Sequence, residues 1–193
     1  AYTVMYTDGA KGTVRDSFLW GAGHSVVTLH EMSEVTMENN ILGGCEYHAV
    51  RNSGGYMKMS ENIVIDNNRA GAYLGNKDAH GFIRNNLFYG NRGGIWAYYG
   101  TDVTVENNIF TRSSEIGVSF WDTCNMKINR NSIIHNPVGM SEHQKQGTGD
   151  GARTAENHFW KNAEDTKDFE KSENAISGDP MFNDPVNGDY SVK

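Results

Sequence analysis

Short runs of alternating apolar and polar residues recur along the chain at nearly constant intervals. Residues 35–41 read Val-Thr-Met-Glu-Asn-Asn-Ile, and residues 103–109 repeat this almost letter for letter as Val-Thr-Val-Glu-Asn-Asn-Ile. Alternation with a period of two over four to eight residues predicts half-buried β-strands. No segment keeps a 3.6-residue period over the roughly 11 residues that an amphipathic helix needs. The pattern therefore predicts an all-β chain.

The same frame fits seven places in the chain, each marked by one anchor residue that is an asparagine in every copy but the first. The anchors are spaced by 23, 22, 24, 22, 23 and 26 residues. A period in this range indicates a solenoid. A leucine-rich repeat has a similar period but needs a leucine framework that this chain lacks, and a propeller blade needs about 40 residues. The anchors are Ser17, Asn40, Asn62, Asn86, Asn108, Asn131 and Asn157.

A single-stranded parallel β-helix of about six to seven coils fits this repeat, with each coil stacked about 4.8 Å from the next. Asparagine at a corner tolerates the left-handed backbone conformation. Stacked on its equivalents, it can also form a hydrogen-bonded amide ladder along the coils. A second asparagine column follows five residues after the anchors, and a glycine then opens the next strand. This column is Asn67, Asn91, Asn136 and Asn162, and the glycines are Gly71, Gly94, Gly117 and Gly139.

The Glu-Asn-Asn-Ile runs, the Asn-x4-Asn spacing and the glycine-opened strands resemble the right-handed parallel β-helix proteins of the pectate-lyase-like superfamily. Within it, the chain is similar to the right-handed β-helix repeat group of carbohydrate-active and surface proteins. The resemblance covers roughly residues 4–162, and residues 178–190 are similar to the closing segment of many such proteins. It implies a polysaccharide or oligosaccharide ligand and a secreted, periplasmic or cell-surface location. Stacking repeats do not specify a reaction.

We expect β-helix coils over residues 1–162 and a C-terminal capping segment and tail over residues 163–193. Thr3–Tyr6 stands where a glycine-opened strand should stand, so the chain begins inside a coil, and we expect an N-terminal continuation or a docking partner to cover it. We expect Gln144–Arg153 to form a polar loop and Lys161–Asn174 to form a short capping helix. From Ile176 onward we expect an irregular chain.

Charge and cysteine content narrow the class of protein. The formal net charge of −7 weighs against nucleic-acid binding, and no run approaches the roughly 18 apolar residues of a membrane span.

Cys45 and Cys124 lie about three coils apart, an axial rise of about 14 Å, whereas a disulfide tolerates at most about 7 Å between Cα atoms. Both should be free thiols, with Cys45 packed in the second asparagine column.

Strand alternation assigns one set of side chains to the core and its neighbours to the surface. The expected core residues are Val27, Leu29, Val50, Ala72, Leu74, Ile95, Ala97, Val118 and Phe120. Their expected outward neighbours are Thr28, His30, Arg51, Tyr73, Trp96, Tyr98, Ser119, Trp121, Ser141 and His143.

The outward set contains an aromatic row. We assign Trp96 and Trp121 to outward positions of consecutive coils, with Tyr73 one coil earlier, Tyr98 beside them and Tyr99 at the next corner. Exposed rings of this kind stack on sugar faces. The alternative is that the polar loop, the tail or another domain covers this face of the protein.

Two sets of residues suit chemistry on a glycan. A lyase or epimerase acting on a uronate needs a base and a cation, for which the candidates are His30, Arg51, Lys77 and His80. A glycoside hydrolase needs two carboxyl groups about 5 to 9.5 Å apart, for which the candidates are Glu31, Asp78, Asp102 and Asp122. Neither set forms a diagnostic motif, so a non-catalytic carbohydrate-binding or structural surface role is the alternative. No zinc spacing or phosphate-binding loop is present, and no calcium-loop motif supports a calcium site at the Asp-rich corners, so no cofactor is expected.

Overall fold

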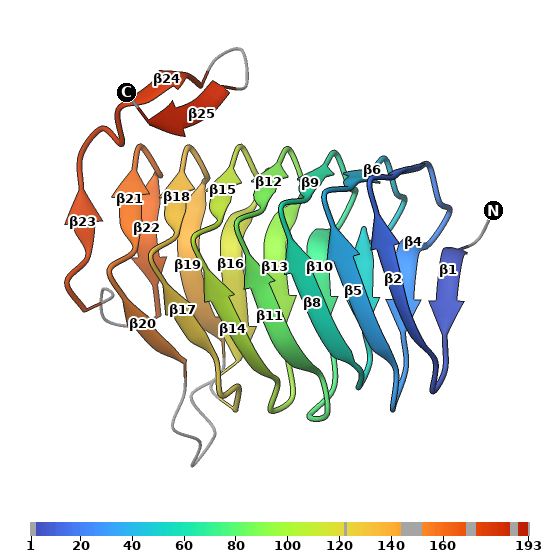
Figure 1. Ribbon diagram of the computed structural model, residues 1–193. Coiled ribbons are helices and arrows are strands. Elements are labelled where there is room, and N and C mark those ends of the chain that lie inside the picture. The colour runs from blue at the N-terminus through green and yellow to red at the C-terminus, as the bar shows by residue number, and fades with distance from the viewer. Residues whose placement is uncertain (1–2, 122, 144–151, 169–172, 186–188, 193) are drawn as a thin grey trace.

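The computed structural model describes residues 3–121, 123–143, 152–168, 173–185 and 189–192 of the chain, which winds into a three-sided β-helix (Figure 1). Each coil contributes one strand to each of three long sheets, so neighbouring strands in a sheet come from successive coils. The strand pairs in these sheets are parallel, as in β1 with β4, β2 with β5 and β3 with β6. The parallel β-helix predicted from the repeat is confirmed.

The three sheets are named A, B and C in the order in which each coil visits them. Sheet A consists of β1 (Thr3–Thr7), β4 (Ser25–Leu29), β7 (Val50–Asn52), β10 (Ala70–Leu74), β13 (Gly93–Ala97), β16 (Ile116–Trp121), β19 (Val138–His143) and β22 (Glu164–Lys167). Sheet B consists of β2 (Lys11–Arg15), β5 (Glu34–Glu38), β8 (Tyr56–Ser60), β11 (His80–Arg84), β14 (Asp102–Glu106), β17 (Lys127–Asn129) and β20 (Arg153–Ala155). Sheet C consists of β3 (Phe18–Trp20), β6 (Ile41–Gly43), β9 (Ile63–Ile65), β12 (Leu87–Tyr89), β15 (Ile109–Thr111), β18 (Ser132–Ile134), β21 (His158–Trp160) and β23 (Ile176–Ser177).

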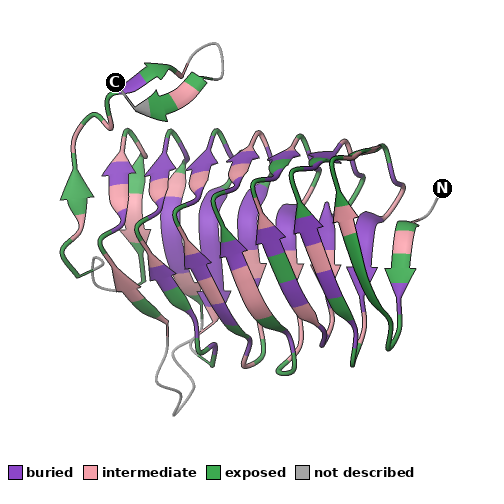
Figure 2. Cartoon of the chain, viewed as in Figure 1, coloured by how far each residue is buried: buried purple, intermediate pink, exposed green. Residues whose placement is uncertain are grey.

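Side chains alternate between the interior and the surface along these strands, most regularly in sheet B (Figure 2). In register with one another, Val35 and Met57 point inward, and so do Met37 and Met59. In sheet A, every residue that alternation assigned to the core is at most 1% exposed. The inward-facing set predicted from the sequence is therefore confirmed.

Glycines in sheet A make room for large side chains of sheet C. Phe88 and Phe110 occupy matching positions of β12 and β15, and their rings stack with centroids 4.8 Å apart. A Cβ atom on Gly71 would lie 2.6 Å from Phe88, and one on Gly94 would lie 2.5 Å from Phe110. Ordinary packing does not allow carbon atoms that close. The glycines that open these strands are therefore part of the core packing.

The anchor asparagines form a buried ladder along the corner between sheets B and C. The Oδ1 atom of Asn86 accepts hydrogen bonds from the backbone N–H of Asn62 and from its side-chain amide, both at 2.9 Å. Asn86 donates in turn to Asn108 Oδ1 from the same two groups. The pattern runs from Ser17 to Asn157, and the six asparagine anchors are at most 2% exposed. The amides thus satisfy one another in the interior.

The left-handed residue at this corner is the one before each anchor, not the anchor itself. Asn39, Asn85 and Asn107 have φ values of 53°, 57° and 56°. Asp16, Glu61, Arg130 and Glu156 hold the corresponding positions of the other coils, also with positive φ. The side-chain amide of each anchor forms the ladder hydrogen bonds, and the residue before the anchor adopts the left-handed backbone conformation.

The second asparagine column is also hydrogen-bonded, through Asn67 to Asn91 and through Asn136 to Asn162. Cys45 occupies this column as expected, since its N–H donates to Asn67 Oδ1 at 3.1 Å. Cys45 and Cys124 are both buried free thiols, which confirms the prediction.

Strand stacking continues past residue 162, where the sequence suggested a capping helix over Lys161–Asn174. That prediction is wrong for residues 164–167, which form β22 and pair in parallel with β19. Asn162 still occupies the second asparagine column, so the chain keeps the coil register here. Of the expected polar loop Gln144–Arg153, residues 144–151 lie outside the described residues, and Arg153 begins β20.

The tail, expected to be irregular, contains a short antiparallel pair, β24 (Phe182–Asp184) and β25 (Asp189–Val192). Figure 1 shows this antiparallel pair beside the sheet C strands. Phe182 is buried with its ring 5.4 Å from that of Tyr190. Burial raises the pKa of the Tyr190 phenol, which sits near Tyr89 and Arg112. The tail is therefore packed onto the β-helix.

Candidate functional site

The outer face of sheet A carries large side chains from three successive coils. Register places Arg51 of β7 opposite Tyr73 of β10, and Tyr73 opposite Trp96 of β13. All three are half-buried. Ser119 and Ser141, next in the same row, are only 3% and 1% exposed. Within this row, Arg51, Tyr73 and Trp96 therefore form an accessible stretch between Thr28, which is 4% exposed, and Ser119.

A second group of rings lies beside this row, where β13 and β16 end. The ring of Tyr98 is 5.5 Å from that of Tyr73 and 5.1 Å from that of Trp121. The ring of Tyr99 lies 5.0 Å from that of Trp121 and is 55% exposed. Tyr73, Trp96, Tyr98, Tyr99 and Trp121 are named here the aromatic patch.

Trp96 and Trp121 lie on strands of consecutive coils, as assigned from the sequence, but they do not hold equivalent positions in the sheet A row. Trp96 pairs with Ser119, whereas Trp121 pairs with His143. Trp121 thus lies two positions beyond Ser119, the register partner of Trp96, and follows Phe120 as Tyr98 follows Ala97. Trp121 also packs partly against the hydrophobic core.

Two rings of the patch rest directly on glycine backbone. A Cβ atom on Gly75 would overlap the ring of Tyr73, and one on Gly93 would overlap the indole of Trp96. Each ring therefore occupies space that any other residue at the glycine position would fill. This holds Tyr73 and Trp96 close to the sheet surface while leaving both partly accessible.

His48, which sequence reasoning missed, joins the rings of this face. Its imidazole lies 4.6 Å from the ring of Tyr73, 5.9 Å from that of Trp96 and 5.9 Å from that of Tyr47. Its Nδ1 atom accepts the backbone N–H of Ala70 at 3.2 Å, which leaves the proton of the neutral ring on Nε2. His48 is 5% exposed, and burial, followed by the charges of Arg69 and Arg51, lowers its pKa to about 3.

His48 stands at the corner before β7, as Tyr47 does, and His24 stands at the same corner one coil earlier. Strand alternation assigns directions only within strands, so it could not place these rings. One pattern in the sequence could have found these rings. An aromatic or basic residue stands just before each of four successive sheet A strands: His24, Tyr47, Arg69 and Arg92.

The candidate lyase residues are divided between different parts of the β-helix. Arg51 projects from sheet A, where its guanidinium lies 5.9 Å from the ring of Tyr73 and its Nε donates to Ser53 Oγ. His30 follows β4 with its ring 4.9 Å from that of Tyr6. Lys77 lies in the turn after β10, beside Gly100. His80 begins β11 in sheet B. Arg51 and His80 thus project from different sheets.

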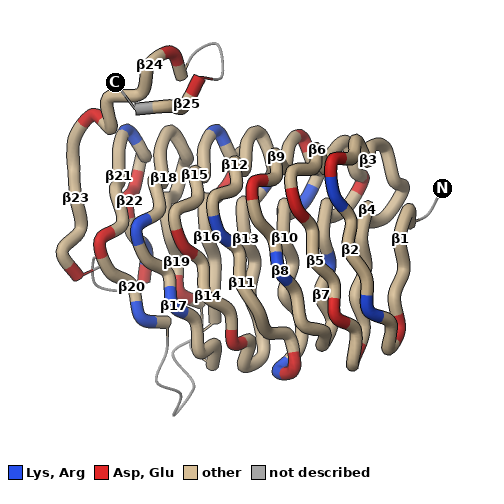
Figure 3. Tube along the Cα trace, in the orientation of Figure 1, with Lys and Arg blue, Asp and Glu red and all other residues tan. Residues whose placement is uncertain are grey.

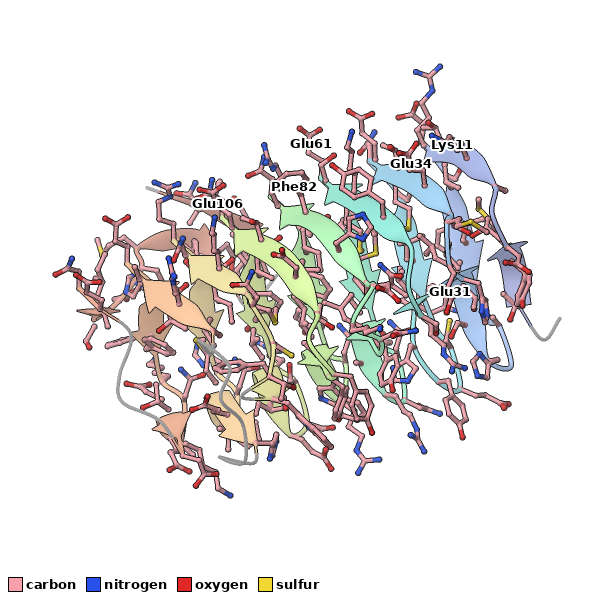
Figure 4. All side chains as sticks on the ribbon, turned by 90° about the horizontal axis from the view of Figure 1, so that it is seen from below. Lys11, Glu31, Glu34, Glu61, Phe82 and Glu106 are labelled. Atoms are coloured by element: carbon pink, nitrogen blue, oxygen red, sulfur yellow. The ribbon has the colours of Figure 1, made fainter. Side chains whose placement is uncertain are left out.

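The candidate carboxylates are likewise dispersed. Glu31 and Asp78 lie in turns between sheets A and B, and Asp102 begins β14 of sheet B. Figure 4 shows Glu31 apart from the sheet B edge that carries Lys11, Glu34 and Phe82. Asp122 lies outside the described residues.

Among the candidate catalytic residues that the structure describes, the register pairs His80 with Asp102, as opposite residues of β11 and β14. Tyr56 flanks His80 on its other side with the two rings 5.0 Å apart. The Nδ1 atom of His80 lies 2.7 Å from the carbonyl oxygen of Asp78. Because a carbonyl only accepts, Nδ1 carries a proton, and in the neutral ring Nε2 keeps its lone pair. Tyr56, His80 and Asp102 belong to sheet B strands, whereas Tyr73 and Trp96 of the aromatic patch belong to sheet A.

Within the described ranges, no group of three or more His, Cys, Asp or Glu side chains is placed to hold a metal ion. A search of the same residues finds no helix of the length and apolar character that crossing a bilayer requires. Acidic and basic side chains are interspersed over the coils without a continuous basic stripe (Figure 3).

The fold is a parallel β-solenoid, defined by stacked three-sheet coils and by the asparagine ladders that join them. A family model described as the right-handed beta helix region matches residues 3–175, and the chain belongs to this family. This is consistent with the pectate-lyase-like superfamily that the sequence resembles. Comparison with curated proteins and with solved structures gives no match.

Proposed function

We propose that this β-helix binds an extended polysaccharide or oligosaccharide along the aromatic patch. The observation that carries the proposal is the placement of Tyr73 and Trp96 on glycine backbone, which presents ring surface on an otherwise regular sheet. Such rings bury apolar area and keep a polar edge for hydrogen bonding, which suits sugar rings. Tyr98, Tyr99 and Trp121 continue this surface across the next coil.

Binding has more support than processing of the glycan. A lyase or epimerase needs its base and its cation at one reacting carbon, within hydrogen-bonding reach. Arg51 and His80 project from different sheets. Of the carboxylates proposed for hydrolysis that the structure describes, Glu31 and Asp78 lie in separate turns and Asp102 lies on sheet B. We therefore place binding first and polysaccharide lyase, epimerase or glycoside hydrolase activity second. As part of the same proposal, a glycan ligand of this kind implies a secreted, periplasmic or cell-surface location.

A glycan array followed by tryptophan fluorescence titration tests the proposal. A bound oligosaccharide should change the emission of the folded protein. Replacing Trp96 by Ala should weaken binding by about 1 to 3 kcal/mol, a range taken from base–aromatic stacking as the nearest analogue. Trp160→Ala is the matched control, because Trp160 is also half-buried but lies on sheet C with the Lys161 ammonium over its ring.

Three outcomes are distinguishable. Equal losses for Trp96→Ala and Trp160→Ala, or no glycan bound by the folded protein, would overturn the proposal. A fall in the melting midpoint for Trp96→Ala without a change in affinity would show that the ring only covers the sheet. An absorbance assay for unsaturated products, run on the glycans that bind, tests processing directly.

A further inference from the structure

The outer face of sheet C carries an apolar stripe that runs along the axis of the β-helix. The outward residue that opens a sheet C strand is apolar from β3 to β15, and strand register aligns these residues in one row. Because neighbouring strands lie about 4.8 Å apart, the row is about 19 Å long. Its members are Phe18, Ile41, Ile63, Leu87 and Ile109.

This apolar stripe is most accessible on the first of these strands. Phe18, Ile41 and Ile63 are 66%, 37% and 38% exposed, and Leu87 and Ile109 are half-buried. The strands β6 and β9 each pair on both sides, so the exposure of Ile41 and Ile63 belongs to the face of the sheet. Contiguous exposed apolar surface, unlike scattered single residues, marks a site of interaction.

The indole of Trp20 widens the stripe beside Phe18. It lies over the backbone of Gly43 and Gly44, where a Cβ atom on either glycine would overlap it. The ring of Phe18 stacks on that of Trp20 with centroids 5.6 Å apart and planes at 8°. A ring that is already packed in this way loses little conformational entropy when a partner covers it, which favours binding.

A shallow groove of about 400 Å³ follows the corner between sheets B and C beside the stripe. On its sheet C side the groove is lined by Phe18, Ile41 and Ile63. On its corner side it is lined by the exposed residues Asp16 and Glu61. The groove is therefore apolar along one side and acidic along the other.

Carboxylates stand on both sides of the stripe, since Asp66 follows β9 at the opposite corner of sheet C. Among the residues that the structure describes, Asp16, Glu61 and Asp66 form no ion pair. Arg15 and Glu38, register partners at the ends of β2 and β5, carry opposite charges that offset each other. The charge of this surface is thus complementary to a partner with basic side chains.

The spacing of the stripe matches an amphipathic helix. Such a helix presents apolar side chains about every 5.4 Å along one face, close to the coil spacing of about 4.8 Å. Side chains on one face of an extended strand repeat at about 6.7 Å and fall out of step with the coils. A second copy of the chain is a poorer partner, because it would bring carboxylates together between two copies that each carry a net charge of −7.

We propose that the outer face of sheet C, from β3 to β15, docks an amphipathic helix with basic flanks from a partner protein. Apolar side chains of the helix pack on Phe18, Ile41 and Ile63. Basic side chains on its flanks pair with Asp16, Glu61 and Asp66. The helix lies along the coil axis on a different sheet from the aromatic patch, so this surface is independent of the proposed glycan site.

Three peptide probes of about 18 residues, or five helical turns, test the surface with the full chain. The first has leucines along one helix face and lysines elsewhere, the second has the same composition with the leucines dispersed, and the third has glutamates in place of lysines. In fluorescence anisotropy, the first should bind roughly tenfold more tightly than either of the others, and added salt should weaken it.

Variants of both parts of the surface locate the binding. Ile41→Thr combined with Ile63→Thr should lower the affinity for the first peptide roughly tenfold, because threonine keeps the β-branch and removes apolar surface. Phe82→Thr is the matched control, since Phe82 is an outward, half-buried apolar residue of sheet B. Glu61→Gln should weaken binding roughly threefold at low salt, whereas Glu31→Gln, in a turn between sheets A and B, should not.

Four results would overturn the proposal. These are no binding of any peptide, equal binding of the first and second peptides, equal losses for the isoleucine double variant and Phe82→Thr, or self-association of the parent chain that the double variant abolishes. The last result, measured by sedimentation, would show that the face joins two copies of the chain. Trp96→Ala should leave peptide binding unchanged, which keeps this test separate from that of the glycan site.

Discussion

Phe110 in sheet C fills the space that a side chain at Gly94 in sheet A would need. A Cβ atom on Gly94 would lie 2.5 Å from the Phe110 ring and even closer to the carbonyl oxygen of Gly117 on the next coil. Gly71 stands in the same relation to Phe88, and Gly139 in a looser one to Phe159, at 3.2 Å. In these three coils, a small residue in one sheet is thus coupled to a large residue in another.

Gly94→Ala should destabilise the β-helix, because the new methyl group meets backbone on one side and a packed ring on the other. Overpacking of this kind costs about 1 to 3 kcal/mol of unfolding free energy. Urea denaturation followed by circular dichroism measures the change. Gly12→Ala is the control, since its Cβ atom would meet only the end of the Met5 side chain, at 3.9 Å. Equal stability of the two variants would show that the groups around Gly94 move apart for the methyl group at little cost in unfolding free energy.

Asn86→Ala should break the ladder in its middle. It removes acceptors for the backbone and side-chain amides of Asn62, and donors to Met59, Arg84 and Asn108. Unpaired buried polar groups cost about 1 to 3 kcal/mol, so the melting midpoint should fall. Asn125→Ala removes an exposed asparagine and serves as the comparison. A midpoint equal to that of the parent chain would contradict a stabilising role for the ladder.

Burial of neutral His48 should make stability depend on pH in the acid range. The pKa of His48 is lowered from 6.5 to about 3, so between these values the unfolded chain binds a proton that the folded chain does not. The unfolding free energy therefore falls as the pH drops from about 6.5 toward 3 and gains nothing from this group above 6.5. From pH 7.5 to 5 the loss due to His48 is about 2 kcal/mol.

Comparison with His48→Gln isolates this contribution. The variant should lose less stability than the parent chain between pH 7.5 and 5, as judged by urea denaturation at each pH. His143→Gln removes an exposed histidine at the end of β19 and should follow the parent chain. Parallel pH profiles for the parent chain and His48→Gln would mean that His48 protonates freely in the folded state.

The two thiols should be unreactive in the folded protein. Cys45 and Cys124 are each 1% exposed, and burial raises the pKa of both. Attack on a disulfide reagent requires an accessible thiolate. We expect no rapid reaction at pH 8 in buffer and reaction of two thiols in denaturant. Rapid modification of either cysteine in buffer would show that its coil opens.

The sequence by itself determined the coil, because equivalent residues of stacked repeats pack against one another and so share one environment. The anchors Asn62, Asn86 and Asn108 share one environment, so a single recurring residue type was enough to reveal the ladder. Alternation likewise determined the inward residues of sheet A, such as Leu74 and Ile95. Local periodicity is a property of the chain and can be read without coordinates.

The site was decided by tertiary structure, because it depends on relations between coils and at corners. Trp121 follows Phe120 as Tyr98 follows its register partner Ala97, and the stacking of these coils brings the two rings to 5.1 Å. At the corners alternation no longer holds, so only the folded chain brings the His48 ring to 4.6 Å from that of Tyr73. The segment after Asn162 was also decided by stacking, since pairing with β19 makes β22 a strand despite its charged, helix-like composition. Local sequence specifies the repeat, but the length of each coil and the packing at its corners set which outward side chains meet.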